Sequence, residues 1–189
     1  MFLSIFNLIL SSLASILAGV LLLRFWMQAI HIRPPSPVAE FTFQLTDWLV
    51  LRLRRIIPGV GGYDWSSLFA AVLLALLLAT LQVMLGMRDF NPLLILIIGL
   101  HKLVTWICYG FLGALLLGVI FSWVNPYAPL APFVRALTDP LLRPIRRVVP
   151  AIGGIDFSSM VVWILLLVVM QVADGMMATL VGTLFALPG

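Results

Sequence analysis

The amino-acid sequence predicts an all-α membrane protein with four transmembrane helices, built as a tandem parallel duplication of a two-span unit. Three observations predict this fold class. Of the 189 residues, 63% are hydrophobic and only 10% are charged, whereas a soluble domain carries about 25% charged residues. Four apolar runs are each long enough to cross a bilayer, and one motif occurs twice. A chain so poor in charge cannot cover its surface for water, so we expect a single membrane domain over residues 1–189.

The repeated motif relates residues 45–67 (LTDWLVLRLRRIIPGVGGYDWSS) to residues 137–159 (LTDPLLRPIRRVVPAIGGIDFSS) at a constant offset of 92 positions. The offset superimposes these identical residues: Asp47 on Asp139, Arg54-Arg55 on Arg146-Arg147, Pro58 on Pro150, Gly61-Gly62 on Gly153-Gly154, Asp64 on Asp156, and Ser66-Ser67 on Ser158-Ser159. Chance seldom produces so many ungapped identities, so this is an internal repeat. We assign repeat one to residues 1–89 and repeat two to residues 93–189.

Each predicted span is close to the roughly 20 apolar residues that a membrane helix needs. The four spans cover about residues 3–24, 66–87, 103–124 and 158–179. The first run competes with a signal peptide, but it lacks a basic n-region, and aligning Trp26 with Trp123 gives it a counterpart in repeat two. We therefore expect a retained helix, with Arg24 at its end snorkelling into the membrane interface.

An amphipathic surface helix is predicted after the first and after the third span. Prolines stop the first span from continuing. Residues 38–57 then place Phe41, Leu45 and Trp48 on one side and most of their five charged residues on the other, at helical spacing. So many charges argue against a span, so we expect a helix that lies flat on the membrane. Residues 133–149 repeat this arrangement.

The apolar segment 93–100 is too short to cross a membrane by itself. Two alternatives stay open for it. It forms an interfacial or re-entrant segment, or it extends the third span as a tilted helix.

Positive charges are divided unequally between the two sides of the predicted membrane. The loops that contain the motif carry nine of the eleven: Arg24, Arg33, Arg52, Arg54, Arg55, Arg135, Arg143, Arg146 and Arg147. The other side has only Arg88 and Lys102. Because Lys and Arg concentrate in cytoplasmic loops, we expect the motif loops in the cytoplasm and both termini in the periplasm. The basic balance then indicates contact with anionic phospholipids rather than nucleic acid.

The motif also supplies the candidate binding residues: Arg54, Arg55, Asp64, Asp139, Arg143, Arg146, Arg147 and Asp156. Two interpretations stay open. In the first, the arginines set the topology and pair with Asp64 or Asp156, because a carboxylate at the membrane boundary is costly unless paired. In the second, they form a patch for phosphate headgroups or a partner protein. The Gly-Gly steps do not form a phosphate loop because no lysine follows them; we expect a turn there.

Gln82 and Asp174 form a second candidate site, inside the spans, because the 92-residue offset makes them equivalent. An acid within an apolar span is a functional candidate. The two side chains could hydrogen-bond across the bundle or line a polar cavity. We expect the neighbouring His101 and Lys102 to be snorkelling anchors.

The residue types that most enzymes need are not arranged for catalysis in this sequence. It contains two histidines and one cysteine, and it shows no Ser-His-Asp set, no paired carboxylates on one face and no nucleotide fingerprint. We therefore expect no enzymatic activity, no cofactor and no metal site.

The two motif copies, LRLRRIIPGVGGYDWSSL (residues 51–68) and LLRPIRRVVPAIGGIDFSSM (residues 141–160), resemble the doubled motif of the YggT family, which includes the YlmG relatives. The segment LLLRFWMQ (residues 21–28) resembles that family's first-span ending. The resemblance implies a small bacterial inner-membrane protein with links to osmotic or salt-stress tolerance, ion uptake and membrane-complex assembly. The first copy departs from the family form because Leu51-Arg52 stands where the second copy has Arg143-Pro144.

Two functions of different classes follow as hypotheses. The first is a membrane scaffold or assembly factor whose cytoplasmic arginines bind anionic lipid or a membrane-protein partner. The second is a component of an ion (potassium) uptake or transport system, as a homo-oligomer with a polar path past Asp174 and Gln82. The sequence shows no continuous polar stripe along the spans, which favours the scaffold.

Overall fold

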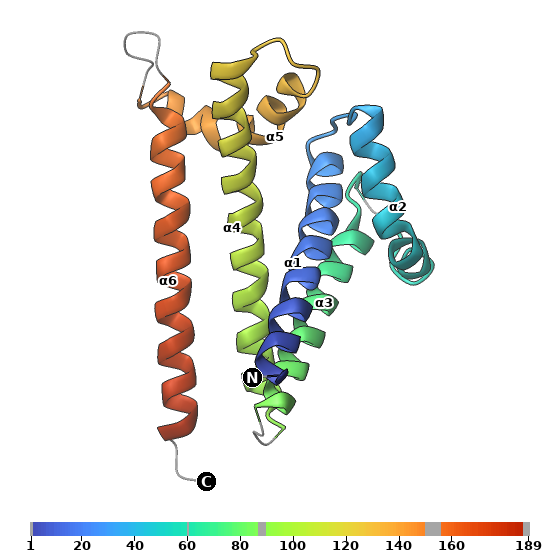
Figure 1. The fold of residues 1–189 in the computed structure, drawn as a ribbon, viewed down its shortest axis with the longest axis vertical. Helices are drawn as coiled ribbons and strands as arrows, with labels where there is room; N and C mark the ends of the chain where they lie inside the picture. Colours follow the sequence, from blue (N-terminus) through green and yellow to red (C-terminus); the bar gives the residue numbers. More distant parts are fainter. Residues whose placement is uncertain (1, 60, 87–89, 150–155, 187–189) are drawn as a thin grey trace.

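Figure 1 shows the protein as a computed structural model, which describes residues 2–59, 61–86, 90–149 and 156–186. Within these ranges the chain forms six α-helices: α1 (Phe2–Ala29), α2 (Ser36–Leu53), α3 (Trp65–Leu85), α4 (Pro92–Val124), α5 (Ala131–Arg146) and α6 (Ser158–Ala186). Four of them, α1, α3, α4 and α6, are long and apolar enough to cross a membrane. The prediction of an all-helical fold with four long apolar helices is confirmed for the described residues.

The longest helix, α4, begins where the sequence supplies a start signal. Asn91 precedes α4, and its side-chain oxygen accepts hydrogen bonds from the amides of Leu93 (3.0 Å) and Leu94 (3.2 Å). Pro92 follows at the first helical position, where its missing N–H costs nothing. No helix breaker follows before Asn125, so α4 runs for 33 residues. Segment 93–100 is therefore a helix extension, and the re-entrant alternative is wrong.

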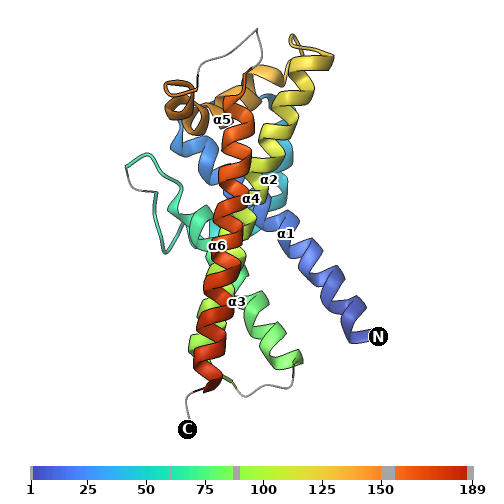
Figure 2. The same ribbon diagram turned by 90° about the vertical axis from the view of Figure 1, so that its left-hand side faces the viewer.

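The four long helices pack in the order α1, α3, α4, α6, and each contacts the next (Figure 1). The shorter α2 packs against α1 and α3, and α5 packs against α4 and α6. In the view turned by 90°, the N-terminal half of α1 leans away from α6 (Figure 2). The pair formed by α1 and α3 is therefore tilted relative to the pair formed by α4 and α6, and α4 connects the pairs by contacting α1 and α3.

A hydrogen bond between helices far apart in sequence ties the two halves together. Trp26 of α1 donates from Nε1 to the carbonyl of Leu137 in α5 at 3.0 Å. Its ring also meets the ring of Phe111 in α4 edge-on, with 5.1 Å between centroids. Beside it, buried Met27 packs with Phe133. The end of α1 is thus fixed against the second half, and this fixes the position of Arg24, one turn earlier.

Candidate functional site: two arginine–aspartate clusters

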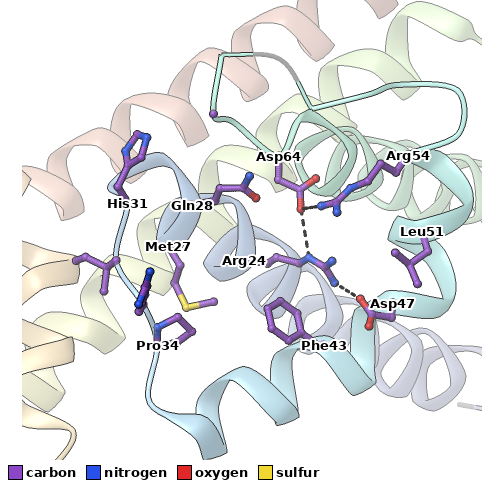
Figure 3. A pocket seen from close by; sticks show the side chains of 13 residues that line it. Arg24, Met27, Gln28, His31, Pro34, Phe43, Asp47, Leu51, Arg54 and Asp64 are labelled. Atoms are coloured by element: carbon purple, nitrogen blue, oxygen red, sulfur yellow. Dashed lines mark hydrogen bonds and ion pairs between the residues drawn. The ribbon is translucent and has the colours of Figure 1, made fainter.

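The first cluster is centred on Arg24, whose side chain is only 6% exposed (Figure 3). Its Nε donates to Asp64 Oδ2 at 3.2 Å, and its Nη1 donates to Asp47 Oδ1 at 2.6 Å. The same Nη1 also donates to Thr46 Oγ1 at 2.7 Å. The guanidinium lies 4.9 Å from the centre of the Phe43 ring, within the range of a cation–π contact. One arginine from α1 therefore binds both α2 and the residue that precedes α3.

Asp64 is the acceptor that this cluster shares. Its side chain is fully buried, and its Oδ2 accepts from Arg24, from Arg54 Nη2 (2.9 Å) and from Ser67 Oγ (2.8 Å). Burial raises the pKa of Asp64, but the hydrogen bonds from Ser67 and Arg54 and the charges of Arg54 and Arg24 outweigh burial and hold that pKa below its ordinary value. Asp64 therefore stays ionised, and its ion pairs clamp three helices together.

The Gly-Gly step of the motif forms the turn that brings Asp64 to this position. Gly61 and Gly62 have φ angles of +69° and +83°, a region that residues with a Cβ adopt only at a cost. A Cβ at Gly62 would also lie 3.2 Å from His31 Nε2. The predicted turn is thus present in the first copy. The equivalent Gly153-Gly154, like Pro150, lies outside the described residues.

The second cluster forms around Arg146. Its Nε and Nη2 donate to Asp156 Oδ2 at 3.0 and 2.8 Å, and its Nη1 donates to Asp139 Oδ1 at 3.2 Å. Arg143 donates to the other oxygen of Asp139 at 2.6 Å. Asp156 also accepts from the amide of Ser158 (3.0 Å) and from its hydroxyl, so it caps the start of α6.

The two clusters differ in burial. Asp156 is 37% exposed and Arg146 is 46% exposed, whereas Asp64 is fully buried. Burial raises the pKa of Asp156 as well, but the hydrogen bonds from Ser158 and Arg146 and the Arg146 charge outweigh it, so that pKa also lies below its ordinary value. Both aspartates are therefore ionised, one in the interior and one at the surface.

Arg24 is the residue that sequence reasoning missed. The sequence predicts that it snorkels at the interface, but the structure buries it as the centre of the first cluster. The reason is that α2 and the turn before α3 supply two carboxylates, so the guanidinium finds ionic partners within the protein. The sequence did contain a signal that Arg24 is specific to repeat one. Aligning Trp26 with Trp123 puts Phe121 at the position of Arg24, so repeat two lacks this charge.

The structure brings together six of the eight predicted motif residues: Arg54 and Asp64 in the first cluster, and Asp139, Arg143, Arg146 and Asp156 in the second. The predicted pairing of motif arginines with Asp64 and Asp156 is present. Arg55 and Arg147 are exposed, and neither has an ion-pair partner among the residues that the structure describes. Of the two arginines in each Arg-Arg step, one therefore points into the cluster and one does not.

Gln82 and Asp174 are not brought together. Gln82 donates from Nε2 to Asn7 Oδ1 at 3.1 Å and to Ser11 Oγ at 3.2 Å, and both partners are on α1. Asp174 on α6 instead lies 2.6 Å from Nε2 of His101 on α4. The hydrogen bond across the bundle between Gln82 and Asp174 was therefore a wrong expectation, because the two side chains face different helix pairs. His101 pairs with an acid rather than serving only as an anchor.

Each cluster lines a cleft. The first cleft, of about 710 Å³, is bounded by Arg24, Phe43, Asp47, Arg54 and Asp64 (Figure 3). The second, of about 960 Å³, lies among α4, α5 and α6 and contains Asp139, Arg146 and Asp156 on its polar side. The arginines and aspartates of the two clefts can bind charged groups at the end of the molecule where α2 and α5 lie. The interaction that these residues offer is ion pairing.

Comparison with known proteins identifies the family of this chain. The family model described as CCB3/YggT matches two stretches of the chain, residues 3–85 and 97–177. The chain belongs to the CCB3/YggT family. This family member is 40% identical to the uncharacterised YggT protein of Escherichia coli K12 over 173 residues, which cover 90% of each chain. The resemblance found in the sequence is thereby confirmed.

Two further relatives of this CCB3/YggT member are also uncharacterised. A Pseudomonas aeruginosa protein is 35% identical over 179 residues, 92% of this chain and 90% of the relative. A Vibrio alginolyticus protein, described by its location in the proC 3′ region, is 31% identical over 187 residues, 94% of this chain and 95% of the relative. No solved structure matches the chain significantly.

Proposed function

We propose that this protein is a non-enzymatic membrane scaffold or assembly factor whose exposed arginines bind anionic phospholipid headgroups and recruit a membrane-protein partner. One observation carries the proposal: the arginines of the motif loops fall into two classes. Arg24, Arg54, Arg143 and Arg146 are engaged by aspartates. The other five are exposed and have no ion-pair partner among the described residues. Of these five, Arg135 donates to the carbonyl of Pro126, and four make no side-chain hydrogen bond that the structure describes: Arg33, Arg52, Arg55 and Arg147.

The exposed class is suited to an anionic surface. A guanidinium is always charged and has five donors that match phosphate oxygens. A basic side chain close to anionic lipid contributes about 1 kcal/mol, so four such groups contribute roughly 4 kcal/mol, or about a thousandfold in affinity. The engaged class keeps the helices that carry the exposed class in place.

The topology that we propose places the motif loops in the cytoplasm and both termini in the periplasm. It is supported by the nine-to-two distribution of positive charges. Exposed apolar side chains on α2, Phe41 (56%), Leu45 (37%) and Trp48 (54%), favour a helix that rests on the membrane interface. The two separate stretches matched by the family model favour a tandem duplication.

The proposal is tested by reversing charge only on exposed arginines, since changing Arg146 would also break its ion pairs. The double variant Arg55→Glu/Arg147→Glu is expected to lose the thermal stabilisation that added anionic phospholipid gives the purified protein in mild detergent. Arg88→Glu, the same change on the side with few positive charges, is the control. If anionic phospholipid stabilises the wild type, the double variant and Arg88→Glu equally, the proposal is refuted.

The recruitment of a partner is tested in cells. Crosslinking in intact cells, followed by purification in mild detergent, is expected to capture one predominant membrane protein with the wild type and with Asp174→Asn. The double variant is expected to lose it. Retention of the same partner by the double variant would contradict a role for the exposed arginines.

One observation favours the alternative of an ion-transport component. His101 Nε2 lies 2.6 Å from Asp174 Oδ1, and the two residues are on neighbouring candidate membrane spans, with Asp174 61% exposed on α6. An ionisable pair within a span is a candidate for an ion pathway. Liposomes that contain only this protein would then show potassium flux that Asp174→Asn abolishes. The absence of flux, together with normal function of Asp174→Asn in cells, would exclude this alternative.

A further inference from the structure

Helix α6 is the candidate membrane span that the rest of the protein covers least. Only 6% of its most apolar stretch is buried, whereas the other three spans have between 22% and 33% of theirs buried. α6 packs mainly against α4 and α5, and it lies at the edge of the bundle, on the side opposite α2 (Figure 1). In the turned view this edge faces the reader (Figure 2). The outer face of α6 is therefore open to the surroundings of the protein.

Two polar side chains lie on this outer face. Gln171 is on the opposite side of α6 from Val162 and Leu166, the buried residues that pack with α4. Gln171 is exposed, and its carboxamide makes no hydrogen bond that the structure describes. Asp174, about one turn later, is 61% exposed. Its Oδ1 lies 2.6 Å from His101 Nε2, whereas no hydrogen bond to its Oδ2 is described. The face thus carries a donor and an acceptor that the described chain leaves unpaired.

Both polar side chains lie deep in any membrane that α6 crosses. The helix continues to Ala186, past residue 179, where the sequence predicts the fourth span to end. At 1.5 Å per residue α6 is roughly 43 Å long, which exceeds an apolar core of about 30 Å. Whichever end of an upright α6 extends beyond that core, Gln171 and Asp174 stay at least about 6 Å inside it. A polar group at that depth is costly unless another polar group pairs with it.

The arrangement of the two groups specifies what can cover them. The covering segment must offer an acceptor to Gln171 and a donor to Asp174, at the same depth and about one helical turn apart. A second α6 in the same orientation meets both conditions, because a two-fold axis along the membrane normal presents the same two groups in exchange. The outer face of α6 is therefore complementary to itself.

We infer that two copies of this protein associate through the outer faces of their α6 helices, and that Gln171 of each copy donates to Asp174 of the other. Gly175 and Ala178 lie on the same face, and small residues let two helix backbones approach closely. A Cβ at Gly175 would meet nothing within 4 Å in the single chain, so the space beside it is available to the second copy.

This inference goes beyond the proposed function and depends on none of the arginines. It identifies a contact within the membrane, whereas the exposed arginines act at the membrane surface. A dimer places two sets of those arginines on one surface, which strengthens binding to anionic lipid without any new contact. The contact also holds if the protein serves ion transport.

The first test is disulfide crosslinking in native membranes, with Cys108→Ser as the background. Ala178→Cys is expected to give a crosslinked product of twice the monomer mass on mild oxidation, because a two-fold axis brings equal positions of this face together. Leu180→Cys is the matched control, on the opposite side of α6 and 46% exposed, and it is expected to stay monomeric. Equal crosslinking of the two variants, a product with a different protein, or no product from Ala178→Cys would overturn the inference.

The second test measures the affinity of the dimer by energy transfer between differently labelled copies in liposomes at increasing dilution. Gln171→Leu is expected to weaken association about tenfold, since it removes two interhelical hydrogen bonds. Gly175→Leu is expected to abolish association by separating the helices. Gly113→Leu adds the same side chain to α4, also with nothing within 4 Å of the added Cβ, and should associate as the wild type does. Wild-type affinity of Gln171→Leu, or equal losses in the two glycine variants, would contradict the assignment.

The dimer and the arginine proposal fail separately. Arg55→Glu/Arg147→Glu is expected to associate like the wild type, and Gln171→Leu is expected to keep the stabilisation that anionic phospholipid gives. If the double arginine variant loses the dimer to the same extent as Gln171→Leu, the contact does not depend on α6 and the inference is wrong.

Discussion

Replacing Asp64 by alanine is expected to destabilise this protein far more than replacing Asp156, although the two residues occupy the same position of the repeated motif. Asp64 is fully buried, and it is the shared acceptor for Arg24 and Arg54. Removing it leaves the buried Arg24 with only one of its two carboxylates. Breaking a buried ion pair by removing one partner costs about 3–5 kcal/mol, so we expect the free energy of unfolding to fall by that amount.

The corresponding loss for Asp156→Ala is smaller because water already reaches that pair. Asp156 is 37% exposed and Arg146 is 46% exposed, and an exposed ion pair contributes about 0.2–1 kcal/mol. The lost cap at the amide of Ser158 adds about 1 kcal/mol. The total is roughly 1–2 kcal/mol, which leaves a difference of roughly 2–3 kcal/mol between the two variants.

The assay is reversible unfolding in mixed micelles by titration with a denaturing detergent. The loss of helix during the titration is monitored by circular dichroism. Asp64→Asn is the matched control, since it keeps the size of the side chain and an acceptor for Ser67 but removes the charge. If the two alanine variants lose the same free energy, or if Asp156→Ala loses more, the assignment of Arg24 and Asp64 as a buried clamp is refuted.

Three further predictions use the same titration. First, the pKa values of Asp64 and Asp156 both lie below the ordinary 3.8, so the stability from their ion pairs is complete above that pH and is lost as the pH falls through the folded-state pKa. We therefore expect these ion pairs to contribute nothing to the pH dependence of stability between about pH 5 and 8. A decline in stability that begins near pH 6 would contradict this. Second, Gly99→Leu should cost about 1–3 kcal/mol, because a Cβ there would lie 2.7 Å from a leucine side chain of α3, whereas Gly110→Leu, with nothing within 4 Å, should be neutral. Third, Trp26→Phe loses the 3.0 Å hydrogen bond to α5 and should cost about 1 kcal/mol; unchanged stability would show that this bond does not join the halves.

Much of the architecture was predictable because it depends on local composition. A continuous apolar run long enough to cross a bilayer forms a helix whatever it packs against, since lipid offers its backbone no other hydrogen bonds. All four long helices were found in this way. The motif also indicated that arginines would pair with Asp64 and Asp156, since a carboxylate near an apolar boundary needs a cation.

The sequence did not show which residues would be the hydrogen-bond partners of Gln82 and Asp174. Hydropathy identified Gln82 and Asp174 as unusual polar residues, but their equivalence in the repeat led to the wrong pairing. Each instead bonds to the helix that packs beside it: Gln82 to Asn7 and Ser11 of α1, and Asp174 to His101 of α4. Which face of a span meets which neighbour depends on how the helices pack, and that is a property of the whole bundle.

The family, the number of long apolar helices and the chemistry of the motif could all be read from the sequence, because they follow from residue types and short-range spacing. The burial of Arg24 between Asp47 and Asp64 and the exposure of the second cluster to solvent became visible only once the helices were packed together. The physical reason is distance along the chain: Arg24 and Asp64 are separated by 40 positions, and only the packing of α1 against α2 and α3 brings their charges within bonding distance.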